Sequence, residues 1–227
     1  MAEIKKILIA NRGEIVQRAI RTIREMGKKS VVVYSAGDKN ASYLKHADEA
    51  VCIGGAKSSE SYLNIPAIIT AAEMTGCDAI FPGYGFLSEN QDFVEICQLH
   101  NIKFIGPSVE VMEKMADKSK AKEEMIRAGV PVVPGSKGSV HSVTEGKKVA
   151  LEIGYPIMAK AAAGGGGRGM RLIHDESEFD QLFMAASSEA LAAFGDGTMY
   201  LERFINNPRH IEVQVVGDSH GNAIHIG

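Results

Sequence analysis

Cysteine is scarce in this sequence, and long hydrophobic runs are missing. The three cysteines, Cys52, Cys77 and Cys97, are odd in number and lack the spacing of a metal site, so we expect buried thiols in a reducing compartment. The first apolar run, residues 7–10, is too short for a signal peptide, and no segment approaches the length that spans a membrane. We therefore expect a cytoplasmic protein with no membrane partner.

Positive charge is not in excess either. The 25 Lys and Arg residues stand against 28 Asp and Glu residues, which gives a formal net charge of −3. That balance does not support a general nucleic-acid binder, so no nucleic-acid partner is expected. The 227 residues, 45% of them hydrophobic, suit a globular protein of one large or two small domains.

Two common nucleotide-binding motifs are absent. A P-loop would place Gly-Lys-Ser or Gly-Lys-Thr at the start of a helix. A dinucleotide fingerprint would need three spaced glycines after the first strand, and only Gly13 is there. The later pattern Gly83-x-Gly85-x-x-Ser88 lacks its last glycine and follows the wrong strand. Nicotinamide or flavin binding is therefore not indicated.

The most informative feature present is a run of four glycines, residues 164–167, bracketed by Lys160 and Arg168. Glycine is costly to order, so such a loop usually brings backbone N–H groups close to an anion such as phosphate. Short apolar segments at 155–159 and 169–173 read as strands on either side. We predict a mobile hairpin that folds over a nucleotide; a Gly/Ser linker would lack these strands.

The first half of the chain alternates between strand and helix patterns, which predicts a parallel sheet covered on both faces, an α/β fold. The expected strands are 7–10, 30–34, 50–53, 79–81 and 103–105, and the expected helices are 14–26, 65–74 and 92–100. A Ser88…Gln91 capping box is expected to start the third helix. Ligands of such sheets bind beyond the carboxyl ends of the strands. Tyr84 and Glu89, which follow the fourth strand, are therefore candidate substrate-proximal residues; alternatively, Tyr84 packs and Glu89 sits in the first turn of the helix.

The second half has a different organisation. One long lysine-rich helix is expected over 109–128, a helix with a Ser142…Glu145 capping box over 142–153, and another over 176–194. Strands are expected at 199–204, 210–216 and 223–226. These patterns divide the chain into residues 1–108 (N-terminal α/β domain), 109–131 (linking helix), 132–204 (a small α+β lid domain with the glycine-rich loop) and 205–227 (the start of a further body).

Six motifs in order carry a family resemblance. They occupy residues 11–15, 81–90, 104–107, 117–118, 164–170 and 207–214. Together they resemble the biotin carboxylase subunit or domain of biotin-dependent carboxylases, an ATP-grasp family, and are most similar to the stand-alone bacterial subunit of acetyl-CoA carboxylase. Pyruvate- and propionyl-CoA-type carboxylases share the motifs. The resemblance implies a Rossmann-like (pre-ATP-grasp) N-terminal domain, an ATP-grasp lid domain and the first strands of an incomplete ATP-grasp body.

The resemblance also implies the reaction. ATP phosphorylates bicarbonate to carboxyphosphate, which releases carbon dioxide to the ureido nitrogen of biotin on a carrier protein. The implied cofactors are ATP and Mg, with carrier-bound biotin as substrate. The implied partners are the biotin carboxyl carrier protein, carboxyltransferase subunits and a second copy in a homodimer. The matching dimer-interface residues are Arg18, Arg21 and Glu25, although a solvated helix face would look the same.

Nucleotide-binding residues follow from the same resemblance. Lys118 and Lys160 match two lysines that meet ATP phosphates, and Gly166 and Gly167 match glycines of the lid. The positions that match the adenine-binding segment, mainly through its backbone, and a nucleotide-contacting histidine are Glu202, Arg203, Phe204, Ile205 and His210. A plain strand and a structural histidine are the alternatives.

The family's magnesium-binding glutamates, its catalytic base and the arginine that holds bicarbonate and biotin have no match before residue 227. We therefore expect no metal ligands and no certain catalytic residue in this chain, and no carboxylation activity from it alone. Two other functions stay open. One is a different ATP-grasp ligase that forms an acyl phosphate, and the other is a non-catalytic nucleotide-binding module.

Overall fold

The computed structural model describes residues 3–116, 118–162 and 169–227, and its description of side chains does not include residues 116–120. The chain forms two compact units, Met1–Ala121 (unit 1) and Lys122–Gly227 (unit 2). Lys118, Gly166 and Gly167, which the sequence assigns to the nucleotide site, lie outside the residues or side chains so described. In the part of the chain that is described, every helix is too short or too polar to cross a membrane.

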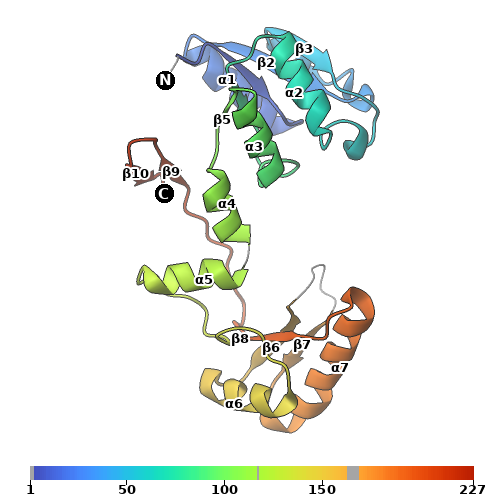
Figure 1. Cartoon of the computed structure of the whole chain (residues 1–227), viewed down its shortest axis with the longest axis vertical. Coiled ribbons are helices and arrows are strands. Elements are labelled where there is room, and N and C mark those ends of the chain that lie inside the picture. Colours follow the sequence, from blue (N-terminus) through green and yellow to red (C-terminus); the bar gives the residue numbers. More distant parts are fainter. Residues whose placement is uncertain (1–2, 117, 163–168) are drawn as a thin grey trace. The chain divides into compact units, whose positions relative to one another are not determined.

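Unit 1 contains a five-stranded parallel sheet (Figure 1). Its strands are β1 (Lys6–Ile9), β2 (Lys29–Tyr34), β3 (Glu49–Cys52), β4 (Ala79–Phe81) and β5 (Lys103–Phe104). They lie in the order β3-β2-β1-β4-β5 with all neighbours parallel. The chain therefore leaves β1 first toward one edge and later toward the other, which makes the gap between β1 and β4 the topological switch point.

Apolar side chains pack on both faces of this sheet, as the sequence predicts. The helices are α1 (Glu14–Glu25), α2 (Ile65–Met74), α3 (Gln91–Leu99) and α4 (Val109–Ala116), with short 3-10 turns at Ala36–Asp38, Ser42–His46 and Ser58–Glu60. One core joins Leu8 and Ile80 to α2 and α3, and a second joins Ile9 and Val32 to α1. Successive strand residues point to opposite faces, so near-continuous apolar strands supply both cores.

Two local expectations for unit 1 were wrong. Helix α3 is capped by Asn90, whose side chain accepts a hydrogen bond from Phe93 N, so the Ser88…Gln91 capping box does not form. Asn90 directly precedes the helix and can reach its free N–H groups, whereas Ser88 lies in the preceding turn. Cys77 and Cys97 are buried, but Cys52 is exposed at the end of the edge strand β3.

Unit 2 is built around a three-stranded antiparallel sheet in the order β7-β6-β8 (Figure 1). The strands are β6 (Ile157–Ala161), β7 (Met170–Ile173) and β8 (Met199–Arg203), and the helices packed on one face are α6 (Val143–Ile153) and α7 (Glu176–Phe194). Their core centres on Ile157, Phe179 and Leu201. The Ser142 side chain accepts from Glu145 N, which confirms that cap of α6.

Within the expected helix 109–128, the structure describes α4 and α5 (Lys118–Arg127), which lie on either side of residue 117. Residue 117 lies outside the described residues, so the single helix stays a prediction at that point. The expected strand 210–216 was wrong. Only β9 (Val215–Gly217) is a strand, paired with β10 (Ala223–His225). A strand needs a hydrogen-bonded neighbour; Ile211 and Val213 lie outside that pairing and are exposed.

Candidate functional site

The open face of the β7-β6-β8 sheet carries an ion pair. Lys160 on β6 lies opposite Tyr200 on β8, and Met158 lies opposite Glu202, so Lys160 and Glu202 are diagonal neighbours on the same face. Lys160 Nζ lies 2.5 Å from Glu202 Oε2. Residues 157, 159 and 201, which alternate with them, point into the helix-covered core. Strand alternation thus separates a buried face from a polar one.

A second cation lies beside this pair. Lys122 of α5 donates a hydrogen bond from Nζ to the Tyr200 hydroxyl at 2.5 Å, and its Nζ lies 5.1 Å from the centre of the Tyr200 ring. Burial is the largest cause of a lowered pKa of Lys122. The negative charge of Glu202 raises that pKa, and the positive charge of Lys160 lowers it further. Burial, followed by the Glu202 charge, raises the pKa of Tyr200 to about 12. Lys160 is thus paired with the Glu202 carboxylate, whereas Lys122 is bonded to Tyr200 and senses Glu202 only through its charge. Two ammonium groups beside one carboxylate give this face a positive charge that suits an anion.

The glycine-rich segment connects the ends of β6 and β7. Ala161 N donates to Gly169 O at 2.9 Å and closes the base of this hairpin. Gly169 has φ +64°, and a Cβ there would lie 3.0 Å from Ala161 Cβ and 3.2 Å from Ala190 Cβ, so this position needs glycine. Residues 163–168 themselves lie outside the described residues. Lys160 stands one residue before the end of β6, at the start of this connection.

The segment expected to receive adenine is partly engaged within unit 2. Arg203 N donates to Pro134 O at 2.8 Å, and Phe204 N donates to Pro156 O at 2.9 Å. The Arg203 guanidinium donates to Ile153 O at the end of α6, on the face opposite Glu202. The Arg203 side chain therefore points away from Lys160, and only its backbone remains near the open face. Ile205 is exposed.

His210 does not join this cluster. It is exposed in the irregular segment before β9, with its Nε2 atom 3.2 Å from Glu212 Oε1. Both side chains are more than four-fifths exposed. Its predicted contact with nucleotide stays a prediction.

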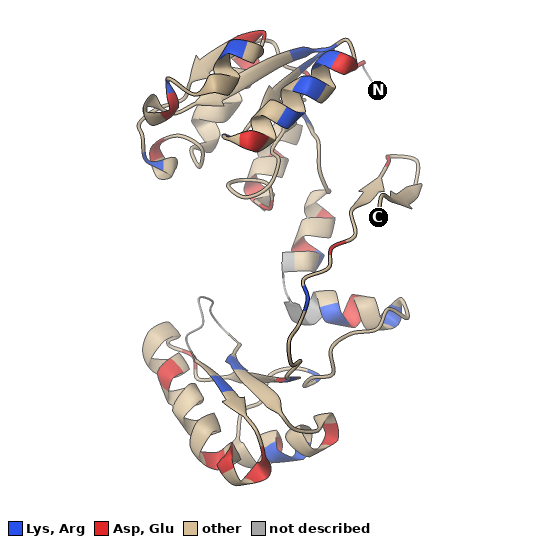
Figure 2. Ribbon diagram, turned by 180° about the vertical axis from the view of Figure 1, so that it is seen from behind, with Lys and Arg blue, Asp and Glu red and all other residues tan. Residues whose placement is uncertain are grey.

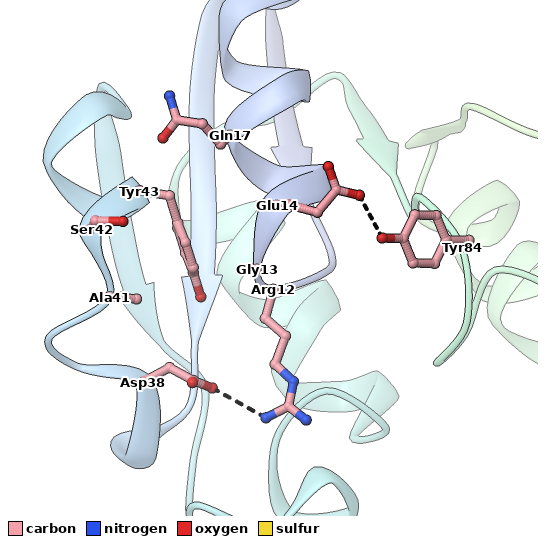
Figure 3. Close-up of a pocket in the computed structure, with 9 residues that line it drawn as sticks. All are labelled: Arg12, Gly13, Glu14, Gln17, Asp38, Ala41, Ser42, Tyr43 and Tyr84. Atoms are coloured by element: carbon pink, nitrogen blue, oxygen red, sulfur yellow. Dashed lines mark hydrogen bonds and ion pairs between the residues drawn. The ribbon is translucent and has the colours of Figure 1, made fainter.

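Unit 1 has a pocket of about 790 Å³ at the carboxyl ends of its strands (Figure 3). The Arg12 guanidinium lies 5.6 Å from the ring centres of both Tyr62 and Phe86, and 3.7 Å from Asp38 Oδ2. Burial alone would raise the pKa of Asp38, but hydrogen bonds from Tyr62 and Ser35 and the charge of Arg12 lower it on balance. Aromatic stacking thus fixes the cation beside the pocket.

Tyr84 lies at the rim of that pocket, where its hydroxyl donates to Glu14 Oε1 at 2.7 Å (Figure 3). Tyr84 is 60% exposed. Glu89 is exposed in the same β4–α3 connection and precedes the helix, so the alternative that placed it in the first helical turn was wrong. The structure brings Tyr84 to the switch point, where a substrate is expected.

The proposed dimer-interface residues Arg18, Arg21 and Glu25 are exposed along α1, whose ribbon carries both basic and acidic positions (Figure 2). The buried residues of the helix, Val16, Ile20 and Ile23, occupy its other side. This arrangement suits either an interface or a solvated face.

Sequence reasoning missed four residues that organise these sites: Lys122, Tyr200, Asn11 and Glu14. Tyr200 could have been found from the period of two that places it on the same face as Glu202. Lys122 was only one of several lysines in the lysine-rich helix expected over 109–128, and nothing in the sequence distinguished it. Among the described residues, no cluster of His, Cys, Asp and Glu is arranged to hold a metal ion.

Comparison with known proteins accounts for both units. Residues 3–112 match the model of the biotin carboxylase N-terminal domain, and residues 117–227 match the ATP binding domain of the carbamoyl-phosphate synthase L chain. A Nostoc sp. biotin carboxylase is 57% identical over 98% of this chain and 50% of its own length.

Solved structures agree. A Campylobacter jejuni biotin carboxylase β,γ-ATP complex is 68% identical, with a TM-score of 0.85, over 98% of this chain and 50% of that chain. The Hydrogenobacter thermophilus 2-oxoglutarate carboxylase biotin carboxylase domain, a dimer with MgADP, ADP and bicarbonate, is 48% identical with a TM-score of 0.81, over 99% of this chain and 49% of that chain.

The parallel sheet followed by the small antiparallel unit is thus the beginning of an ATP-grasp architecture. The chain belongs to the biotin carboxylase family. It spans about half the length of the relatives it matches.

Proposed function

We propose that unit 2 binds ATP on the open face of its β7-β6-β8 sheet and that the whole protein is a biotin carboxylase. The observation that carries this proposal is the pairing of Lys160 with Glu202 beside Lys122, at the start of the glycine-rich connection. Phosphoryl transfer depends chiefly on positioning and charge neutralisation. Two lysine ammonium groups and the backbone N–H groups of a glycine-rich loop are suitable partners for a triphosphate.

Each residue has a part in this proposal. Lys160 exchanges its Glu202 partner for a phosphate oxygen, and Lys118 meets the phosphates from α5. Gly166 and Gly167 cover them and exclude water, which protects the labile carboxyphosphate. The backbone of residues 202–205 receives the adenine edge, with Ile205 as the candidate donor because Arg203 and Phe204 already donate within unit 2. His210 approaches the nucleotide from the irregular segment before β9.

The reaction of the whole protein then runs in two stages. Bicarbonate attacks the γ-phosphate of ATP to give carboxyphosphate and ADP. Carboxyphosphate then breaks down to carbon dioxide and phosphate. A ureido nitrogen of biotin gives its proton to the catalytic base and bonds to the carbon dioxide. Magnesium supplies charge neutralisation to the phosphates through carboxylate ligands. We expect these ligands, the catalytic base and a substrate-binding arginine in the part of the relatives that this chain does not span.

We further propose that the protein serves acetyl-CoA carboxylase in fatty acid synthesis, with a biotin carboxyl carrier protein and carboxyltransferase subunits as partners. The support is the similarity to proteins named biotin carboxylase, such as that of Nostoc sp., of whose length this chain spans 50%. We expect a homodimer through the α1 face of Arg18, Arg21 and Glu25. Carboxylation of an acetyl-CoA carboxylase carrier, but not of a pyruvate or 2-oxoglutarate carboxylase carrier, would support this assignment; equal use of all three would contradict it.

ATP binding is testable on the 227-residue chain itself. Calorimetry with MgATP and with adenosine should show tighter binding of MgATP, because the phosphates add ionic contacts. No detectable binding of either would contradict the site on the sheet face. The chain alone should not carboxylate free biotin.

Activity requires a longer protein. We suggest a hybrid protein in which residues 1–227 are followed by the C-terminal half of the Campylobacter jejuni biotin carboxylase, chosen for its 68% identity. The expected result is bicarbonate-dependent ATP hydrolysis and carboxylation of free biotin. Hydrolysis that instead requires ammonia or another amine would point to a different ATP-grasp ligase. Binding of ATP without any turnover would point to a non-catalytic module.

A further inference from the structure

The loops that follow β1 and β4 meet at the switch point of unit 1. Residues 10–13 follow β1 and lead into α1 at Glu14, residues 82–90 follow β4, and the two strands are adjacent and parallel. A substrate of an open parallel sheet binds at this position. The two loops therefore determine the shape of the surface that a substrate would meet.

Asn11 joins the two loops from within. Its Nδ2 group donates to Pro82 O at 2.7 Å and to Tyr84 O at 2.8 Å. Its Oδ1 atom accepts from Arg12 N at 2.8 Å. Asn11 is only 3% exposed. Both amide hydrogens and the amide oxygen are therefore used, and no apolar side chain of similar size can replace them.

Gly83 lies between the two residues whose carbonyl groups bind Asn11, and the Asn11 side chain comes so close that a Cβ at this position would be crowded. It has φ +66°, and a Cβ at this position would lie 3.0 Å from Asn11 Nδ2 and 3.1 Å from Ile15 Cγ1. Only glycine combines this backbone conformation with so close an approach. The loop is thus shaped to receive the Asn11 side chain.

Glu14 holds the other end of Tyr84. Its Oε1 atom accepts the Tyr84 hydroxyl at 2.7 Å (Figure 3). The Tyr84 backbone is therefore fixed by Asn11 and its phenol by Glu14. Because Tyr84 is 60% exposed, these contacts fix a residue that faces solvent.

We infer that Asn11 and Glu14 are positioning residues that present the Tyr84 ring to biotin at the switch point. This inference rests on the proposed function. An aromatic ring with a carboxylate beside it suits the neutral, largely apolar rings of biotin better than it suits bicarbonate, because Glu14 repels an anion. Neither residue touches the substrate; each acts through Tyr84.

A double-mutant cycle in the hybrid protein tests the pair. Glu14→Ala and Tyr84→Phe should each raise the KM for free biotin about two- to tenfold, the value of one lost hydrogen bond. The double variant should be no worse than either single variant, because both changes remove the same contact. Glu14→Gln retains an acceptor and should restore much of the affinity. The KM for ATP is measured in the same variants, because a general structural change would raise it together with the KM for biotin.

Two controls separate positioning from stability. Glu95→Ala removes an exposed carboxylate from α3 and should leave the KM for biotin unchanged. Asn11→Ala should raise the KM for biotin at least as much as Glu14→Ala, measured below its own unfolding temperature. Because Asn11 is buried and this variant can fail to fold, the exposed Glu14 and Tyr84 variants decide the matter.

The outcomes are distinguishable. If the unaltered hybrid hydrolyses ATP but never carboxylates biotin, the proposed function fails, and this inference fails with it. Two results with an active unaltered hybrid would overturn only the inference. In one, the KM changes of Glu14→Ala and Tyr84→Phe are additive in the double variant. In the other, the KM values for all substrates rise equally. A rise confined to the KM for biotin, shared by both single variants and not increased in the double variant, supports it.

Discussion

Lys160 Nζ lies 2.5 Å from Glu202 Oε2, across two neighbouring strands of unit 2. The side chains are 38% and 25% exposed, so solvent screens the pair and its contribution to folding stability is expected to be below about 1 kcal/mol. The pair therefore matters less for folding stability than for where it places charge. It keeps an ammonium group in a defined place on an otherwise open sheet face.

Lys160→Met should weaken binding of ATP to the 227-residue chain about tenfold or more, because a charge-assisted phosphate contact is lost. Adenosine binding should be unchanged. Calorimetry with both ligands measures the difference. Lys147→Met is a matched control, because Lys147 forms a similar ion pair with Asp180, at 2.8 Å, between α6 and α7. An equal loss in both variants would show that general charge, and not this site, attracts the nucleotide.

Asp48 should make the stability of unit 1 depend on pH. Its carboxylate accepts from Lys29 Nζ at 2.8 Å and from the N and Oγ atoms of Ser30 at 2.9 Å each. The hydrogen bond from Lys29, followed by that from Ser30 N, lowers the pKa of Asp48 to about 2. Because the folded pKa lies below the ordinary 3.8, the stabilisation is full above the ordinary value and is lost as the pH falls toward 2.

Asp48→Asn should therefore reduce the free energy of unfolding most at neutral pH. From pH 4 downward the difference from the wild type should shrink, because protonation of Asp48 removes the same stabilisation from the wild type. Urea unfolding at several pH values, with hydrogen exchange of β2 amides to assign the change to unit 1, measures this. Asp92→Asn, which alters an exposed carboxylate on α3, is the control. A loss that is the same at pH 3 and pH 7 would contradict the explanation.

Tyr84 offers a spectroscopic measure of its contact with Glu14. The hydrogen bond to Glu14 is the largest cause of a raised Tyr84 pKa, and Arg18 acts in the opposite direction. Glu14→Ala should therefore lower the pKa of the Tyr84 phenol, and Arg18→Ala should raise it. Magnetic resonance of labelled tyrosine, assigned with Tyr84→Phe, follows the titration. A Tyr84 pKa that does not respond to Glu14→Ala would mean that the hydrogen bond is not formed in solution.

The fold of both units could be predicted largely from local pattern. The spans predicted for α2, β4 and α7 agree with the observed bounds, because apolar periodicity and caps are properties of neighbouring residues. The strand predicted at 210–216 failed because alternation shows which face is apolar, and not whether a partner strand is present. Ile211 illustrates this, since it is 72% exposed despite its place in the pattern.

The candidate sites were less predictable. Motifs drew attention to Lys160, Glu202 and Tyr84, but not to what holds them. Lys122 meets Tyr200 across 78 positions of sequence, and Asn11 meets Pro82 across 71. Such contacts depend on how strands are ordered in a sheet. A single sequence contains no local signal for them.

Gly146 in α6 tests how tightly unit 2 is packed. A Cβ at this position would lie 2.7 Å from Phe179 Cζ and 3.3 Å from Phe183 Cε2, and these two rings stack at 5.2 Å in the core. Alanine is the better helix former by about 1 kcal/mol, but overpacking a core costs about 1–3 kcal/mol. Gly146→Ala should therefore destabilise unit 2 by about 1 kcal/mol, the middle of a net range of about 0–2 kcal/mol, despite its higher helix propensity.

Thermal unfolding followed by circular dichroism, with hydrogen exchange of β6 amides, measures this loss in unit 2. Glu152→Ala, an exposed change on the same helix, should alter stability by less than about 0.5 kcal/mol. Phe179→Leu shortens the obstructing ring, so Gly146→Ala should cost less in that background than in the wild type. If Gly146→Ala instead stabilises the chain, α6 packs more loosely on α7 than the stacked rings indicate, and helix propensity is the larger effect.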